Sequence, residues 1–190
     1  MIDAGSGTVA FSDDFEADVL GVQATGWTRV GGSSGDWVVV ADGTQVFAQN
    51  HSMSSTLRVC RAGPTLSTAA AVSAQVKITA NGSSGVTTAM VCVRYPAGGG
   101  TPYACLALEA GVGAQIKTGG TNGPVWATTV SIGTWYDAKL EVDASGALTG
   151  YLDGALLGTF TPASSIASGS VAIATQSAEA EFDNVVLTTP

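Results

Sequence analysis

Residues 147–160 read ALTGYLDGALLGTF, and this stretch decides the fold class. Two apolar runs flank the dipeptide Asp153-Gly154. An Asp-Gly pair between two such runs is the strongest short-range signal for a β-hairpin, because both residues tolerate the positive φ of a two-residue turn. We therefore predict two antiparallel strands joined by a tight turn.

Strand patterns continue toward both ends of the chain, and no helical periodicity interrupts them. Residues 69–78 and 136–143 alternate apolar and polar side chains, as strands buried on one face do. Residues 87–95 and 103–111 flank a glycine-rich loop and predict another hairpin. We predict an all-β protein, an antiparallel two-sheet β-sandwich of jelly-roll type, in a single domain over residues 1–190. Its first and last strands are expected to lie near each other.

The composition argues against two classes of partner. The net charge is −8, the pI is about 4.3, and the seven basic residues are scattered. Nucleic acids and anionic membranes both require clustered cationic side chains, so we expect neither as a partner. The sequence contains no apolar stretch of about 18 residues or more, so it predicts no membrane-spanning helix. The first ten residues lack the basic start and apolar centre of a signal peptide, so we expect a mature or excised domain.

The three cysteines leave two interpretations open. Cys92 and Cys105 flank the glycine-rich loop almost symmetrically, so they can face each other across a hairpin and form a disulfide, which would suit an oxidising compartment. Alternatively, these two and Cys60 are small buried hydrophobic residues, since free cysteine is among the most buried residue types.

Three stretches, taken in order, resemble a known superfamily. They are FSDDFEADVLGVQATGW at residues 11–27, GDWVVVADGTQVFAQN at residues 35–50, and the C-terminal segment from residue 136 to residue 187. Together they resemble the concanavalin A-like lectin/glucanase superfamily in its LamG-like branch, which includes carbohydrate-binding modules and domains shaped like polysaccharide lyases. The resemblance covers nearly the whole chain. It implies the fold but not the substrate, because this scaffold hosts many functions.

The resemblance also implies a structural calcium ion. In such domains the acidic first strand and the final Phe-Asp sequence meet at Ca²⁺, and the matching residues are Glu16 and Asp183. Ser52 and Ser55, from the loop before the strand that begins near residue 57, are the expected further ligands. An all-oxygen ligand set drawn from distant segments suits this hard cation. The alternative is that both acids are solvated carboxylates at a sheet edge.

A concave sheet face is the site that the resemblance implies for sugars. Arg94 is similar to the concave-face arginine of the branch, and Tyr103 lies across the predicted hairpin from it. Alternation places Arg94 on the same face as Met90 and Cys92. Alternation places Gln115 and Lys117 on one shared face. The alternative for Arg94 is a surface position or an ion pair with Glu109.

The tryptophans divide into two expected roles. Trp126 follows a glycine-rich loop, so we expect it to be the aromatic platform on which a sugar stacks. Trp27 and Trp37 lie in the motifs that resemble the superfamily, and we expect both in the core.

The leading hypothesis is a secreted, non-catalytic polysaccharide-binding domain with structural calcium, acting as a monomer or as a module of a larger protein. The paired-carboxylate motif of a retaining glucanase is absent. The first alternative is a lyase acting on a uronate polymer, in which Arg94 and Lys117 neutralise the carboxylate and Tyr103 or His51 moves the proton. Its typical Gln-Ile-His strand motif occurs here only as Gln-Ile-Lys. The second alternative is an adhesion module.

Overall fold

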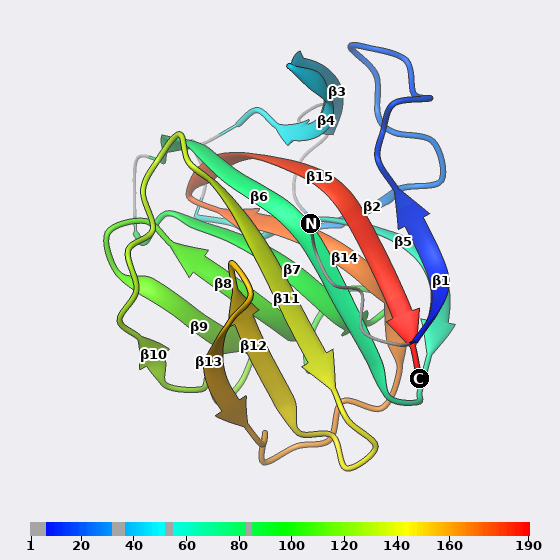
Figure 1. The fold of residues 1–190 in the computed structure, drawn as a ribbon, viewed down its shortest axis with the longest axis vertical. Helices are drawn as coiled ribbons and strands as arrows, with labels where there is room; N and C mark the ends of the chain where they lie inside the picture. The colour runs from blue at the N-terminus through cyan, green and yellow to red at the C-terminus, as the bar shows by residue number, and fades with distance from the viewer. Residues whose placement is uncertain (1–6, 32–36, 52–54, 83–84) are drawn as a thin grey trace.

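The computed structural model describes residues 7–31, 37–51, 55–82 and 85–190, and these form two antiparallel β-sheets packed face to face (Figure 1). The predicted all-β, two-sheet jelly-roll sandwich is confirmed. The described residues contain no helix. Accordingly, none of those segments is a helix long and apolar enough to cross a membrane.

The front layer in Figure 1 is an eight-stranded sheet with the order β13-β12-β11-β6-β15-β4-β3, and β1 pairs along β15. Its strands are β1 (Thr8–Asp13), β3 (Trp37–Asp42), β4 (Thr44–Gln49), β6 (Ala70–Asn81), β11 (Trp135–Val142), β12 (Leu148–Leu152), β13 (Ala155–Phe160) and β15 (Ala178–Thr189). Every ladder in this sheet is antiparallel.

The rear layer is a seven-stranded sheet with the order β10-β9-β8-β7-β14-β5-β2. Its strands are β2 (Thr28–Gly31), β5 (Arg58–Leu66), β7 (Thr88–Tyr95), β8 (Ala104–Glu109), β9 (Gly113–Lys117), β10 (Val125–Trp126) and β14 (Gly169–Gln176). The chain passes repeatedly from one sheet to the other, for example from β5 to β6 to β7, and this exchange gives the jelly-roll topology.

The hairpin predicted from residues 147–160 is present. Strands β12 and β13 pair with Leu152 opposite Ala155, and the turn residues Asp153 and Gly154 have φ values of 50° and 77°. Both therefore lie in the left-handed region that a type I′ turn requires at its two central positions.

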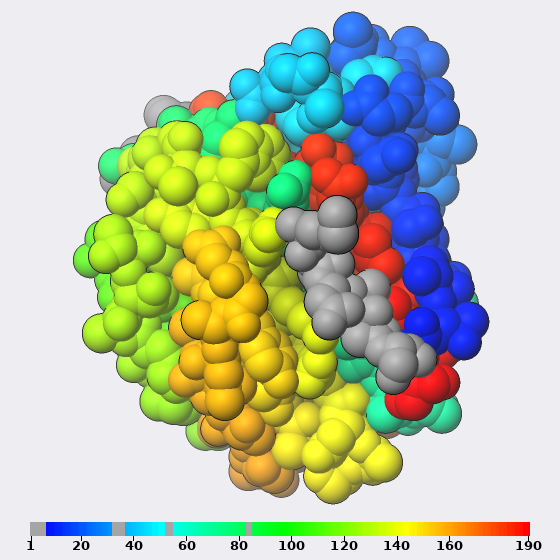
Figure 2. Space-filling view, in the orientation of Figure 1, coloured from blue at the N-terminus to red at the C-terminus, as the bar shows by residue number. Residues whose placement is uncertain are grey.

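The two ends of the described chain lie side by side, as the sequence predicted. β1 runs antiparallel to β15, with Thr8 opposite Thr189. Figure 2 shows these two segments in contact along one margin of the molecule, the first in blue and the last in red. This pairing joins the first and the last strand of the chain within the front sheet.

Aromatic side chains fill one end of the core between the sheets. Phe47 is fully buried, and the rings of Trp27 and Trp37 lie 5.6 Å and 5.3 Å from it. These two tryptophans are only 4% and 3% exposed, so their predicted place in the core is confirmed. Ring contacts of this kind add to the stabilisation from buried area.

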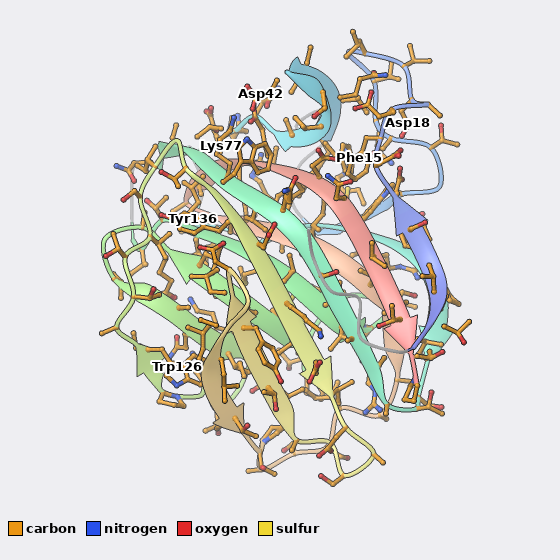
Figure 3. All side chains as sticks on the ribbon, in the orientation of Figure 1. Phe15, Asp18, Asp42, Lys77, Trp126 and Tyr136 are labelled. Atoms are coloured by element: carbon orange, nitrogen blue, oxygen red, sulfur yellow. A yellow bond between two sulfur atoms is a disulfide. The ribbon has the colours of Figure 1, made fainter. Side chains whose placement is uncertain are left out.

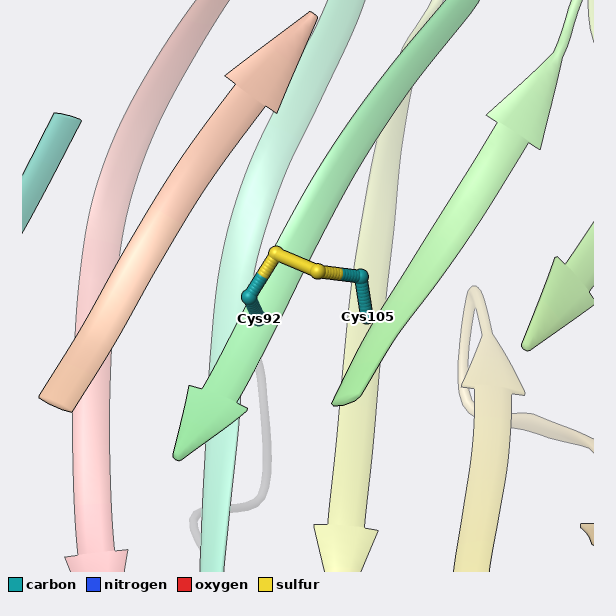
Figure 4. Close-up of a disulfide and its surroundings, with 2 residues drawn as sticks. All are labelled: Cys92 and Cys105. Carbon is teal, nitrogen blue, oxygen red and sulfur yellow. A yellow bond between two sulfur atoms is a disulfide. The ribbon is translucent and has the colours of Figure 1, made fainter. Parts of the chain in front are cut away.

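Cys92 and Cys105 form a disulfide between β7 and β8 (Figure 4). They stand directly opposite each other in the ladder, with their Cα atoms 4.0 Å apart. Cys60 remains a free thiol, is fully buried in the core, and has its pKa raised by that burial to about 12. The first interpretation therefore holds for the hairpin pair and the second for Cys60.

The disulfide is expected to stabilise the fold. Replacing Cys92 and Cys105 together by alanine should lower the free energy of unfolding by about 3 kcal/mol, because a cross-link that closes a loop of this length restricts the unfolded chain by that amount. Equilibrium urea denaturation measures the change. As a control, a reductant should lower the midpoint of the wild type and leave that of the double variant in place. An unchanged wild-type midpoint in reductant would contradict the expectation.

Candidate functional site

The outer face of the seven-stranded sheet carries a second buried layer, separate from the core. Met90 and Cys92 of β7 point away from the core, because Val91 between them lies in it. We call this layer the outer floor, and it consists of Val59, Met90, Cys92, Tyr95, Cys105, Ala107, Ala172 and Ala174. Each member is 3% exposed or less. The middle of this sheet is therefore buried on both faces.

The polar side chains at the rim of the outer floor include Tyr103, Gln115 and Lys117. Lys117 pairs with Cys105 in the ladder and Gln115 pairs with Ala107, so both share the face of the floor, as alternation predicted. The Lys117 ammonium forms an ion pair with the buried Glu109 carboxylate, 2.5 Å away. The Gln115 side-chain amide donates a hydrogen bond to the Gly123 carbonyl at 2.8 Å. We call these three residues the rim.

Tyr103 is held in a fixed plane. Its ring stacks on that of Tyr95, with centroids 5.5 Å apart and planes 26° apart, and it packs against the outer floor. Burial raises the pKa of the Tyr103 hydroxyl, and burial also raises the pKa of Tyr95. The Tyr103 hydroxyl therefore stays protonated at neutral pH and can donate a hydrogen bond, but it is poorly suited to act as a base.

Arg94 does not offer its guanidinium to a ligand on this face. The guanidinium donates to the carbonyls of Ser67 at 3.0 Å, Thr68 at 2.6 Å and Ile166 at 3.0 Å, and the residue is only 6% exposed. Alternation fails here, because Arg94 has a φ of 55° beside an irregularity in the β7–β14 ladder. Arg94 therefore ties together the loop after β5 and the loop before β14, and neither a surface position nor an ion pair with Glu109 describes it.

Trp126, the predicted platform, is half-buried and packs against the β12–β13 hairpin. Its indole lies over Gly158, where an added Cβ would come within 2.7 Å of Nε1, and near Gly150, the residue opposite Gly158 in the β12–β13 ladder. Figure 3 shows Trp126 between β10 and this hairpin. Two facing glycines leave a slot for the ring, so Trp126 joins the two sheets at their edge.

Glu16 and Asp183, which we call the acid pair, come together at the end of the chain's first strand. Asp183 is 5% exposed and accepts hydrogen bonds from Thr44 Oγ1 at 3.3 Å and from the Asn184 backbone N–H at 2.7 Å. The Glu16 carboxylate accepts a bond from the Gln45 backbone N–H at 3.0 Å. The β3–β4 hairpin therefore lies against both acids.

The environment of Asp183 disfavours its ionised form. Burial raises its pKa, and the neighbouring carboxylates of Glu16 and Asp14 raise it further, while hydrogen bonds from Asn184 and Thr44 oppose the change. In the described ranges no salt bridge reaches Asp183. A buried carboxylate beside other carboxylates is an unfavourable arrangement that a bound cation would relieve.

Ser55 and His51, the other described residues predicted for metal binding or catalysis, do not join these clusters. Ser52 lies outside the described residues. The Ser55 carbonyl accepts a hydrogen bond from Gln176 at the end of β14, so Thr44 and Gln45 take the place expected of Ser55 beside the acid pair. His51 is exposed just after β4, in the other sheet from Tyr103 and Lys117. Asp42-Gly43 between two apolar runs is a sequence signal for the β3–β4 hairpin, but nothing in the sequence around residue 44 placed this hairpin beside Asp183.

No protein-family model and no curated protein sequence matches this chain. Solved structures match it at low identity. The carbohydrate-binding module CBM66 from Bacillus subtilis matches with a TM-score of 0.68 and 16% identity over 87% of this chain and 96% of that one. A β-glucanase from Bacillus licheniformis matches with a TM-score of 0.62 and 13% identity over 96% of this chain and 99% of that one. A mutant alginate lyase in complex with alginate tetrasaccharide matches with a TM-score of 0.59 and 11% identity over 94% of this chain and 96% of that one.

These matches extend along almost the full length of both chains in each comparison. The chain has the concanavalin A-like jelly-roll fold. At such low identities the likeness is a likeness of fold, and one fold supports many activities, so the function of this chain has to be argued from its own side chains.

The slot for Trp126 gives a test of the packing at the sheet edge. Replacing Gly158 by alanine should lower the free energy of unfolding by about 1–3 kcal/mol, because the new Cβ overlaps the indole. Urea denaturation followed by tryptophan fluorescence measures this change. Gly98→Ala is the matched control, since an added Cβ at Gly98 meets nothing within 4 Å. Equal stability of the two variants would contradict the packing described for Trp126.

Proposed function

We propose that this chain is a non-catalytic carbohydrate-binding domain that binds a polysaccharide across the outer face of its seven-stranded sheet. The observation that carries the proposal is the rim, in which a partly exposed aromatic ring, an amide and an ammonium stand close together at the edge of the buried outer floor. Sugar recognition needs an apolar surface for C–H groups together with a few fixed hydrogen-bonding side chains. Tyr103 provides both, Gln115 provides an amide, and Lys117 provides an ammonium.

The solved structures of similar fold support this choice. One is named a carbohydrate-binding module, and another is the carbohydrate recognition domain of Emp47p. Their fold places no residue of this chain in contact with a sugar, so the proposal rests on the side chains of the outer face. The fixed plane of the Tyr103 ring reduces the entropy lost when a ligand binds.

The second candidate function, a polysaccharide lyase, is favoured by one observation. Lys117 and Tyr103 share the outer face, and the alginate lyase of similar fold carries alanine in place of one lysine and one tyrosine in its complex with alginate tetrasaccharide. An elimination needs a base that takes a proton from the uronate ring. The raised pKa of Tyr103 works against that role, and Lys117 is already engaged in the ion pair with Glu109. We therefore rank binding above catalysis.

We also propose that the domain is secreted, alone or as a module of a larger protein. The support is the Cys92–Cys105 disulfide, because disulfides form and persist mainly in oxidising compartments.

We propose that the acid pair holds a structural Ca²⁺. Glu16 and Asp183 would supply carboxylate oxygens, and Thr44 a neutral oxygen, which is the all-oxygen chemistry that Ca²⁺ prefers. No group of three acidic, histidine or cysteine side chains suited to a metal occurs in the part of the chain described here, so backbone carbonyls and water would complete the ligand set. The ion would fix β1, the β3–β4 hairpin and β15 together.

Carbohydrate binding is tested by affinity electrophoresis through gels that contain neutral or uronate polysaccharides. Tyr103→Ala should weaken retention at least about tenfold, because it removes an aromatic contact and a hydrogen bond worth roughly 1.5–3 kcal/mol together. Tyr151→Ala is the matched control, since Tyr151 lies on the other sheet beside its own lysine–glutamate pair, Lys139 and Glu141. Equal weakening by both variants would contradict the assignment of the face.

The same incubations separate binding from catalysis. We expect uronate polymers to show no growth in the ultraviolet absorbance of an unsaturated uronate. If that absorbance grows and Lys117→Ala abolishes the growth, the lyase replaces the binding domain as the function.

The calcium proposal predicts opposite effects of one substitution in two conditions. With Ca²⁺ at about a hundred times its dissociation constant, the melting temperature of the wild type should rise by roughly 5–10 °C, and that of Asp183→Asn should not. In chelator, Asp183→Asn should be at least as stable as the wild type at neutral pH. The reason is that the folded-state pKa of Asp183 is raised, so the ionised carboxylate destabilises the fold above that pKa.

The pH dependence of the chelated wild type follows from the same pKa. Its stability relative to Asp183→Asn should increase as the pH falls through the raised pKa of Asp183 toward the ordinary value of 3.8, because the folded state then takes up a proton. Differential scanning calorimetry with and without Ca²⁺ measures both effects. A wild type indifferent to Ca²⁺, or an Asp183→Asn variant that still responds to it, would end the calcium proposal.

A further inference from the structure

A cleft of about 160 Å³ opens beyond Tyr103, where the strands β8 and β9 meet their loops. Three loops enclose it: the loop before β8 at residues 101–102, the loop after β9 at residues 118–121, and the loop after β13 at residues 162–164. We call it the end cleft. It adjoins the rim, because the Tyr103 backbone N–H donates to the Thr118 carbonyl at 3.1 Å.

The side chains of the end cleft are neutral, and several of them are hydroxyls. Thr101, Thr121 and Ser164 are exposed hydroxyl residues, and the lining contains no charged side chain. The rings of Pro102 and Pro162 add apolar C–H surface to the same lining. Hydroxyl donors and acceptors next to apolar patches suit a neutral sugar ring, whereas nothing in the lining would pair with the charge of a uronate or a phosphate.

The walls of the end cleft are built before any ligand arrives. Ile166, in the loop after β13, is buried, and its carbonyl accepts a hydrogen bond from the Arg94 guanidinium. Thr118 donates its hydroxyl to the Thr121 carbonyl at 2.5 Å, which fixes the loop after β9. The ring of Tyr103 lies against Gly119, where an added Cβ would be 2.6 Å from Cε1. Preformed walls reduce the ordering cost of binding.

The size of the end cleft restricts what can enter. Pockets that hold a drug-sized ligand have volumes of roughly 300–1,000 Å³, so a cleft of this volume accepts about one sugar ring. Because the cleft is lined by three loops and has room for about one ring, a polysaccharide would place a terminal ring in it. The rings that follow would then lie over Tyr103 along the rim.

We propose that the end cleft is a subsite for one neutral sugar ring at the end of a polysaccharide chain. The inference rests on the proposed binding of carbohydrate by the outer face, and it adds that the domain recognises chain ends in preference to chain interiors.

The test compares competitors that contain the same mass of sugar but different numbers of chain ends. Each neutral polysaccharide that retains the protein in affinity electrophoresis is used as a soluble competitor, both intact and after limited acid hydrolysis to several lengths. The potency of the competitor per unit mass should rise in proportion to the number of chain ends. Thr121→Trp, which fills the end cleft, should lower the affinity for the hydrolysed competitor at least tenfold and remove the dependence on chain ends.

Two controls separate the possible failures. Thr129→Trp places the same side chain at an exposed position outside the cleft lining and should behave as the wild type. Ser164→Trp fills the cleft from another wall and should reproduce Thr121→Trp. If polymers are retained but hydrolysis and both cleft variants change nothing, the chain-end subsite is wrong while the binding function stands. If no polysaccharide retains the wild type, both proposals fall together.

Discussion

The structure depends on a sheet that is buried on both of its faces. In β7 every residue from Thr88 to Tyr95 is buried, and in β8 every residue from Ala104 to Glu109. One row of side chains completes the core and the other forms the outer floor, so most residues in both rows are apolar, small or cross-linked. The buried polar residues Thr88, Arg94 and Glu109 lie at or next to the ends of these two strands. The apolar middle of this face leaves Tyr103, Gln115 and Lys117 at its edge, where a ligand can reach them.

The opposite sheet is closed by strand β15, which meets a different constraint. It lies between β6 and β4, and β1 pairs along its second half. Phe182 points into the core, and its neighbour Asp183 is buried beside Glu16. An ionised carboxylate is costly at such a place, so the chain's last strand carries an electrostatic requirement as well as an apolar one. Lys77 in the neighbouring strand β6 forms ion pairs with Glu181 and with the more exposed Asp42, and Figure 3 shows Lys77 beside Asp42.

The architecture could be predicted from the sequence, but the site could be predicted only in part. Local signals were sufficient for the Asp153-Gly154 turn, and alternation placed Gln115 and Lys117 on one face. The prediction for Arg94 failed because an irregular ladder and a positive φ break the alternation at that residue. The packing of Trp126 could not be predicted because its slot depends on two glycines that only pairing of β12 with β13 brings together. Thr44 was missed because its position beside Asp183 depends on a contact between strands 139 residues apart.

The central claim is that a saccharide binds at the rim and in the end cleft. Backbone and side-chain NMR shifts, recorded while an oligosaccharide from a retained polysaccharide is titrated in, locate that contact residue by residue. We expect the residues with perturbed shifts to cluster at Tyr103, Gln115 and Lys117 and to extend into the loops around the end cleft. Perturbations confined to the outer face of the eight-stranded sheet, around Tyr151 and Lys139, would contradict it.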